Sequence, residues 1–271
     1  MAVGPGRAGR VHGGVAAPAL IAIGLDIPVL YRDAALAVVD KPAGLMAHAS
    51  PMARGEDDFL VDRLREQFAA PVHLIHRLDR ATSGCLLIAF DRDVAAALGR
   101  VFMSRDVRKD YLAICRGWPA ERLLVDYPLD GGPGKPEKKP AITEFVRLAT
   151  AEVATPSAQH PTSRYALLRC SPQTGRYRQI RRHLKHLSHH LIGDSSHGDG
   201  RHNRSFRMVG VHRMLLHAWR LRFAHPLDGR MLETIAPWDD EWEKAMRFLG
   251  WEDGVVQLDA PDGSSNDAAA I

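Results

Sequence analysis

Apolar residues recur at helical spacing in several parts of the chain. Residues 59–68 place their apolar side chains on one helical face, and the segment that opens at Asp93 repeats the pattern, with Asp93 in the capping position. The same periodicity runs through residues 176–191 and through residues 241–251. The spacing therefore predicts four amphipathic helices.

Other segments follow the two-residue period of strands. In residues 109–117, Tyr111 and Cys115 fall on one side, and Leu112 and Ile114 fall on the other. Further strands are predicted soon after residue 27 and at residues 36–39, 85–90, 141–148 and 163–170. Strands and helices mix without a steady βαβ rhythm, which indicates an α+β fold with a central mixed, largely antiparallel sheet flanked by helices and loops.

Composition is that of an ordinary globular protein. The chain has 271 residues, of which 45% are apolar and 25% are charged, and its formal net charge is +4. Residues 27–251 form the expected catalytic region. Residues 1–26 predict a disordered leader, or an early start codon, rather than a targeting signal, and residues 252–271 predict a disordered acidic tail. No apolar run approaches the roughly 20 residues of a membrane span.

Cysteine usage indicates the compartment. Cys85, Cys115 and Cys170 are far apart and form no CxxC pair. This spacing predicts free, buried thiols in a reducing compartment, and therefore a cytoplasmic protein.

Basic side chains gather in the predicted helix at residues 176–191 and in the segment after it. The helix contains no acidic residue, whereas a solvated surface helix usually mixes both signs. A surface helix with extended arginines is the ordinary alternative. The charge pattern favours a face that binds a polyanion such as nucleic acid. The candidate contacts are Arg176, Arg178, Arg182, Lys185, Arg201 and Arg204.

Four histidines in the same segment raise the alternative of a metal site. His183, His186, His189 and His190 have no neighbouring cysteine and no HExxH pattern, and not all four can share one helical face. Hydrogen-bonding or exposed histidines are therefore expected, without a metal.

The stretch IHRLDRATSG places one carboxylate, Asp79, between Arg77 and Arg80, just before an apolar strand. On charge pattern alone, a structural ion pair is the favoured interpretation. The nearby positive charge also favours the ionised form that a nucleophile needs. The chain has no Walker A or GxSxG motif.

Five motifs in order resemble one enzyme family, the RluA-type pseudouridine synthases. HRLDRATSG resembles the family's active-site motif HRLDxxTSG. KPAGLMAH from Lys41, RKDYLAICRG from Arg108, TGRYRQIRRHL from Thr174 and RMLLHA from Arg213 resemble its other motifs. The resemblance covers residues 27–251. It implies the pseudouridine synthase fold and an isomerase that needs no cofactor or metal.

The resemblance also implies roles for five residues. Asp79 matches the nucleophilic aspartate, and Arg181 matches the basic residue paired with it. Arg77 matches the arginine that enters the space left by the flipped base, and Tyr111 matches the tyrosine that stacks on that base. Leu216 matches the apolar residue beneath the base.

The match has one uncertain register and three departures. Leu215 is the alternative to Leu216 if the match is shifted by one residue. Asp40 replaces an Asn, Arg178 replaces a His, and His190 replaces a Pro. None of the three departures changes the nucleophile.

A longer run, RRHLKHLSHHLIGDSSHGDGRHNR, resembles the branch of the family that isomerises uridine-65 in the T-arm of tRNA. This predicts tRNA as the partner, with no membrane and no obligate protein partner. The alternatives are a ribosomal-RNA enzyme of the same family, a non-catalytic RNA-binding or chaperone protein, and a metal-dependent hydrolase that uses the histidines.

Overall fold

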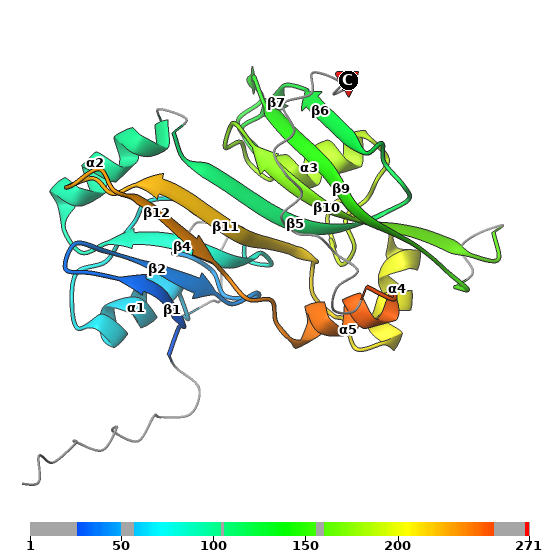
Figure 1. Cartoon of the computed structure of the whole chain (residues 1–271), viewed down its shortest axis with the longest axis horizontal. Coiled ribbons are helices and arrows are strands. Elements are labelled where there is room, and N and C mark those ends of the chain that lie inside the picture. The colour runs from blue at the N-terminus through cyan, green and yellow to red at the C-terminus, as the bar shows by residue number, and fades with distance from the viewer. Residues whose placement is uncertain (1–25, 50–56, 104–105, 156–159, 252–268, 271) are drawn as a thin grey trace, which may run out of the picture.

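The computed structural model describes residues 26–49, 57–103, 106–155, 160–251 and 269–270 (Figure 1). The leader predicted at residues 1–26 therefore lies outside the described residues, apart from its last position. The same holds for the predicted acidic tail, except for the backbone of residues 269–270.

An 11-stranded sheet runs through the described part of the chain. Its main path follows β1 (Val29–Arg32), β2 (Leu36–Lys41), β4 (Ser83–Ala89), β11 (Leu216–Ala224), β5 (Arg108–Arg116), β10 (Ser163–Pro172), β9 (Ile142–Val153), β6 (Arg122–Asp126) and β13 (Ala269–Ala270). β3 (His73–Leu74) pairs with β4, and β12 (Met231–Ile235) pairs with β11. Within this sheet only the β4–β11 and β6–β13 pairs are parallel, which confirms a mixed, largely antiparallel arrangement.

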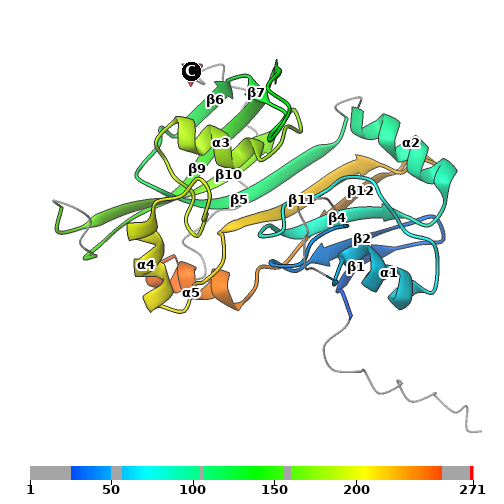
Figure 2. The ribbon, with the colours of Figure 1, turned by 180° about the vertical axis from the view of Figure 1, so that it is seen from behind.

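Helices cover both faces of this sheet. They are α1 (Leu60–Phe68), α2 (Arg92–Met103), α3 (Gln179–His186), α4 (Gly200–Met208) and α5 (Asp240–Phe248). The apolar clusters assign α1 and α3 to one face, and α2, α4 and α5 to the opposite face. Figure 2 shows α3 lying over β9 and β10. The α+β class is confirmed.

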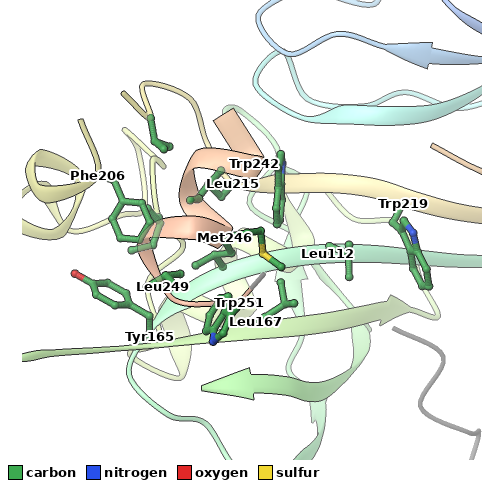
Figure 3. Packing of buried hydrophobic residues seen from close by; sticks show 14 residues of the cluster. Leu112, Tyr165, Leu167, Phe206, Leu215, Trp219, Trp242, Met246, Leu249 and Trp251 are labelled. Carbon is green, nitrogen blue, oxygen red and sulfur yellow. The ribbon is translucent and has the colours of Figure 1, made fainter. Parts of the chain in front are cut away.

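Strand β5 shows why the faces differ. Its alternating side chains separate as predicted, because successive residues of a strand point to opposite sides. Leu112 packs in the cluster that contains Trp242 and Met246 of α5 (Figure 3). Ala113 and Cys115 pack in the cluster beneath α3. Tyr111 lies on this second face, so the alternation directs it toward the side of the sheet that carries α3.

Two predicted helix starts and one predicted length are wrong. Asp91, not Asp93, accepts hydrogen bonds from the first turn of α2. α3 spans only residues 179–186 of the expected 176–191, because Arg178 and Ser188 adopt left-handed backbone angles (φ 51° and 61°) on either side of it. After Ser188 the chain turns back, and Leu191 bridges to Cys115 of β5.

The sequence pattern did not reveal α4, β6 or β12. α4 begins after Asp199, whose side chain accepts a hydrogen bond from the backbone of Arg201 at 3.0 Å. Its glycine and its polar residues conceal the helical period. Residues 130–140 form a loop, except for a short ladder between β7 (Leu129–Asp130) and β8 (Lys138–Lys139).

All three cysteines are free and buried, as predicted. None of the helices in the described part of the chain is long and apolar enough to cross a membrane.

Candidate active site

A cavity of about 340 Å³ lies between the loop that precedes β4 and the N-terminal end of α3. Five residues that were predicted from separate parts of the chain line it together: Arg77, Asp79, Tyr111, Arg181 and Leu216. Arg176 and Arg178 from the predicted basic set also line it.

The loop that carries Asp79 is fixed by the Lys-Pro-Ala-Gly turn after β2. The buried Lys41 ammonium donates to the carbonyls of Pro42, Arg80 and Thr82 at 2.7, 3.1 and 2.9 Å. The backbone N–H of Gly44 donates to the same Arg80 carbonyl at 2.8 Å. These bonds brace the backbone on the C-terminal side of the carboxylate, so its position is set before any substrate arrives.

Gly84 in the Thr-Ser-Gly turn permits close contact with β11. Its φ is 107°, and a Cβ added there would lie 2.3 Å from the carbonyl oxygen of Ala218. Only glycine fits both the backbone angle and the space. Neighbouring Ser83 shares a 2.7 Å hydrogen bond with His217 of the same strand, so this turn fixes β4 against β11.

His76 lies three residues before Asp79 in the same loop, and its side chain is held by protein contacts. Its Nε2 accepts a hydrogen bond from the backbone of Leu87, and its ring stacks on Phe102. Burial lowers the pKa of His76 to about 3, so the ring is neutral at physiological pH.

Asp79 pairs with an arginine 102 positions along the chain. Arg181 Nη1 donates to Asp79 Oδ2 at 2.6 Å. The flanking arginines do not take this role: Arg80 Nε donates to the carbonyl of Gly44, and Arg77 has no ion pair among the described residues. The partner implied by the family resemblance is therefore the one found, and the local ion pair favoured by charge pattern is not.

A second carboxylate holds the other edge of Arg181. Asp194 accepts from Arg181 Nε at 2.7 Å and from Nη2 at 2.8 Å, and its side chain is fully buried. Burial acts to raise the pKa of Asp194, but the bonds and charge of Arg181 outweigh it, and the net shift is downward. The bidentate pair leaves Nη1 directed at Asp79.

Sequence reasoning missed Asp194. The only feature in the sequence that points to Asp194 is that it follows Gly193 just after the basic helix, and no spacing rule connects it to Arg181.

Tyr111 lines the cavity without a hydrogen bond from its hydroxyl to any described residue. Burial and the negative charge of Asp79 raise the pKa of its phenol. It is therefore a neutral phenol at physiological pH, able to stack and to donate a hydrogen bond.

The apolar floor of the cavity is Leu216. Leu215, the alternative of the one-residue shift, belongs to the cluster on the opposite face, with α5. The alternation of residues in β11 thus favours Leu216.

The remaining basic candidates have different surroundings. Arg182 donates to the side chain and the carbonyl of Asp130, which ties α3 to the β7–β8 ladder. Lys185, Arg201 and Arg204 are exposed and do not line the cavity.

The four histidines point to separate protein partners. His183 bonds Thr143 and the carbonyl of Tyr127, and His186 stacks on the ring of Tyr127. His189 and His190 bond the carbonyls of two different segments. In the described ranges, no group of three or more His, Cys, Asp or Glu residues could hold a metal ion.

Comparison with known sequences identifies the fold and the chemistry. A profile of the RNA pseudouridylate synthase family matches residues 35–186, which is more than half of the chain. This chain belongs to the RNA pseudouridylate synthase family. It is accordingly an isomerase that converts uridine in RNA to pseudouridine.

Relatives and solved structures agree with this assignment. The synthase is 38% identical to tRNA pseudouridine synthase C of Vibrio parahaemolyticus, over 86% of this chain and 99% of the relative. It is 40% identical to tRNA pseudouridine synthase C of Salmonella typhimurium, over 83% of this chain and 90% of the relative. Its structure resembles human RNA pseudouridylate synthase domain containing 1, with a TM-score of 0.62 and 26% identity over 79% of this chain and 84% of that one.

Proposed function

We propose that this pseudouridine synthase acts on tRNA and isomerises uridine-65 in the T-arm. The names of the two bacterial relatives support tRNA as the substrate. The run of residues after α3 contains an HGDxxxNR pattern at residues 197–204. Its resemblance to the tRNA branch of the family supports uridine-65 as the target within tRNA. Such an enzyme would work in the cytoplasm, without an obligate protein partner.

The observation that carries the chemistry is the Asp79–Arg181 pair in the wall of the cavity. The reaction breaks the bond from C1′ to N1 of uracil, turns the base and forms a bond from C1′ to C5. N1 gains a proton and C5 loses one, so the product is an isomer of the substrate. Asp79 assists cleavage either by attack on C1′ or by taking a proton from the ribose. In both routes Arg181 keeps the carboxylate ionised and oriented.

The other lining residues would handle the base. A uridine in a folded arm is buried, so it must leave its stack at a cost of a few kcal/mol. Arg77 is exposed at the cavity and has no protein partner among the described residues, so it is free to enter the vacated space. Tyr111 and Leu216 would then enclose the uracil ring from two sides.

Asp79→Asn tests the catalytic assignment. The variant should fold normally and bind tRNA, because it keeps the side-chain volume, but it should show no detectable isomerisation. Asp62→Asn on the exposed face of α1 is the matched control and should retain activity. Turnover by the Asp79 variant at the wild-type rate would refute the assignment.

Mapping pseudouridine in total RNA, from cells with and without this gene, tests the substrate. Loss of the modification at the T-arm uridine is the expected result. Loss confined to ribosomal RNA would transfer the activity to that substrate, and unchanged maps would favour a non-catalytic role.

A further inference from the structure

A second cavity, of about 260 Å³, adjoins the first at Asp79, which lines both. The two cavities share Arg77, Leu78, Asp79, Tyr177, Arg178 and Arg181. The second lacks the Tyr111 and Leu216 side chains that make the first suitable for a base. In their place it has hydroxyl and imidazole groups from Ser195, Ser196 and His48.

Some of the polar side chains that line this second cavity have no hydrogen-bond or ion-pair partner among the described residues. The Ser195 and Ser196 hydroxyls and the His48 ring make no hydrogen bond there, and the guanidinium groups of Arg77 and Arg178 form no ion pair there. By contrast, Arg181 is fully engaged by its two carboxylates. A set of donors without acceptors is suited to a ligand that brings oxygen acceptors and negative charge.

The geometry of a nucleotide indicates which ligand this is. If Asp79 acts at or beside C1′, the ribose lies over Asp79. The base then extends from C1′ into the first cavity, toward Tyr111 and Leu216. The phosphates are attached through O3′ and C5′, on the other side of the sugar ring. The backbone of an unbroken RNA strand must therefore pass on the side of the second cavity.

We propose that the second cavity is a subsite for a phosphodiester adjoining the flipped uridine. Arg77 and Arg178 supply positive charge, and the hydroxyls of Ser195 and Ser196 donate hydrogen bonds to the phosphate oxygens. This proposal rests on the proposed function, because it takes RNA as the substrate. Contacts of this kind fix the position of a nucleic acid without reading its sequence.

A phosphate fits this cavity better than a second base does. The guanidinium of Arg178 lies over the Tyr177 ring at 4.9 Å and so covers a face on which a base would stack. Four arginines, Arg77, Arg80, Arg178 and Arg181, outnumber the single carboxylate Asp79 in the lining, and the apolar residues Met46, Ala47, Leu78 and Ala81 complete it.

The subsite is also built from the segments that hold the catalytic pair. His48 follows the turn that braces the Asp79 loop. Ser195 and Ser196 follow Asp194, whose Oδ1 accepts from the backbone N–H of Ser196 at 2.8 Å. A phosphate held between these segments would therefore be placed at a fixed offset from Asp79 and Arg181, which aligns C1′ with the carboxylate.

The test uses full-length tRNA joined from synthetic pieces. A single uncharged methylphosphonate replaces the phosphodiester on the 5′ or the 3′ side of the target uridine. Wild-type enzyme should lose roughly 10- to 100-fold in kcat/KM at one of these positions, the range expected for a charged hydrogen-bond partner. The double variant Ser195→Ala/Ser196→Ala should lose activity on unmodified tRNA and show little further loss with the methylphosphonate.

Arg100→Ala on the exposed face of α2 is the charge-matched control and should keep the full wild-type sensitivity. Arg178→Ala supplies a second test of the same coupling if the serine variant unfolds. Equal, additive losses in wild type and variants would overturn the subsite. Wild-type activity that is insensitive to both replacements would also overturn it and leave the proposed function intact, whereas absence of isomerisation on unmodified tRNA would reject the proposed function.

Discussion

At the scale of single residues, the position of one guanidinium group organises the site. Arg181 contacts Asp79 through one nitrogen and Asp194 through the other two, and both it and Asp194 are buried. The Asn203 side chain in turn holds the backbone around Asp194. It accepts a hydrogen bond from the Gly193 N–H and donates one to the Asp194 carbonyl. Part of the HGDxxxNR pattern therefore supports the catalytic pair.

Asp194→Asn should impair catalysis more than RNA binding. Its amide cannot accept both Arg181 bonds, so the guanidinium should shift relative to Asp79. A misplacement of about 1 Å can reduce a rate roughly 100-fold, and the broken buried pair should lower the free energy of unfolding by about 3–5 kcal/mol. Steady-state kinetics should show a lower kcat with KM little changed.

Asp199→Asn is the control for Asp194, because Asp199 lies in the same segment and also pairs with an arginine, Arg116 of β5. It should lower thermal stability without a comparable loss of kcat. Equal losses of kcat in both variants would assign Asp194 a purely structural role.

Asp40, which stands where the family usually has Asn, should make stability depend on pH. Burial and the charge of Asp239 raise the pKa of Asp40 to about 6, from an ordinary value of 3.8. Well below pH 3.8 the group is protonated in both the folded and the unfolded state, and its folded environment then costs no stability. Above pH 6 the folded state carries a disfavoured carboxylate, a cost of roughly 1–2 kcal/mol after allowance for partial exposure.

Asp40→Asn should therefore raise the melting temperature by several degrees at pH 8 and leave it nearly unchanged at pH 4. Thermal unfolding followed by circular dichroism at the two pH values measures this. A shift of equal size at both would show that the charge of Asp40 is not the cause.

At the scale of elements, the parallel contact between β4 and β11 brings the Asp79 loop to Leu216. This contact joins residues more than 130 positions apart, at Ser83–His217 and Gly84–Ala218. Helix α3 is the other element that positions residues of the site. The chain enters α3 through a left-handed residue, Arg178, whose side chain lines both cavities.

Gly84→Ala should destabilise the protein by more than about 2 kcal/mol, because the methyl group would meet the Ala218 carbonyl and the φ of 107° disfavours alanine. Gly99→Ala in α2 meets no atom within 4 Å and should instead stabilise by roughly 0.5–1 kcal/mol. Chemical denaturation of both variants decides the point. Similar effects in the two would mean that the β4–β11 contact relaxes.

At the scale of the whole molecule, one sheet separates two kinds of surface. The face with α3 carries the cavities, while α4 and α5 seal the opposite face with the cluster around Trp242 (Figure 3). Two arginines of α4, Arg201 and Arg204, are exposed outside the cavities and could extend the contact with a large RNA.

The double variant Arg201→Ala/Arg204→Ala should weaken tRNA binding and leave kcat unchanged. Each lost phosphate contact should reduce the slope of log K against log salt by about 0.7–0.9. Binding titrations at several salt concentrations measure this slope, with Arg100→Ala as the control. An unchanged slope would exclude α4 from the RNA interface.

The sequence alone determined the α+β class, most of the long strands and helices and, through the family resemblance, five of the residues that line the first cavity. It could do so because the periods of strands and helices are local properties, and because the five motifs carry chemistry in recognisable residue types. Tyr111 could even be assigned to the correct face of β5 by alternation.

Only the tertiary structure decided which charges meet. Local charge pattern paired Asp79 with its neighbours, whereas the fold gives it Arg181, and gives Arg181 in turn to Asp194. Backbone reversals at Arg178 and Ser188, which shorten α3, also depend on the strand packed beneath it. Ion pairs and reversals of this kind are set by contacts between distant segments, and no periodic pattern in the chain records those distances.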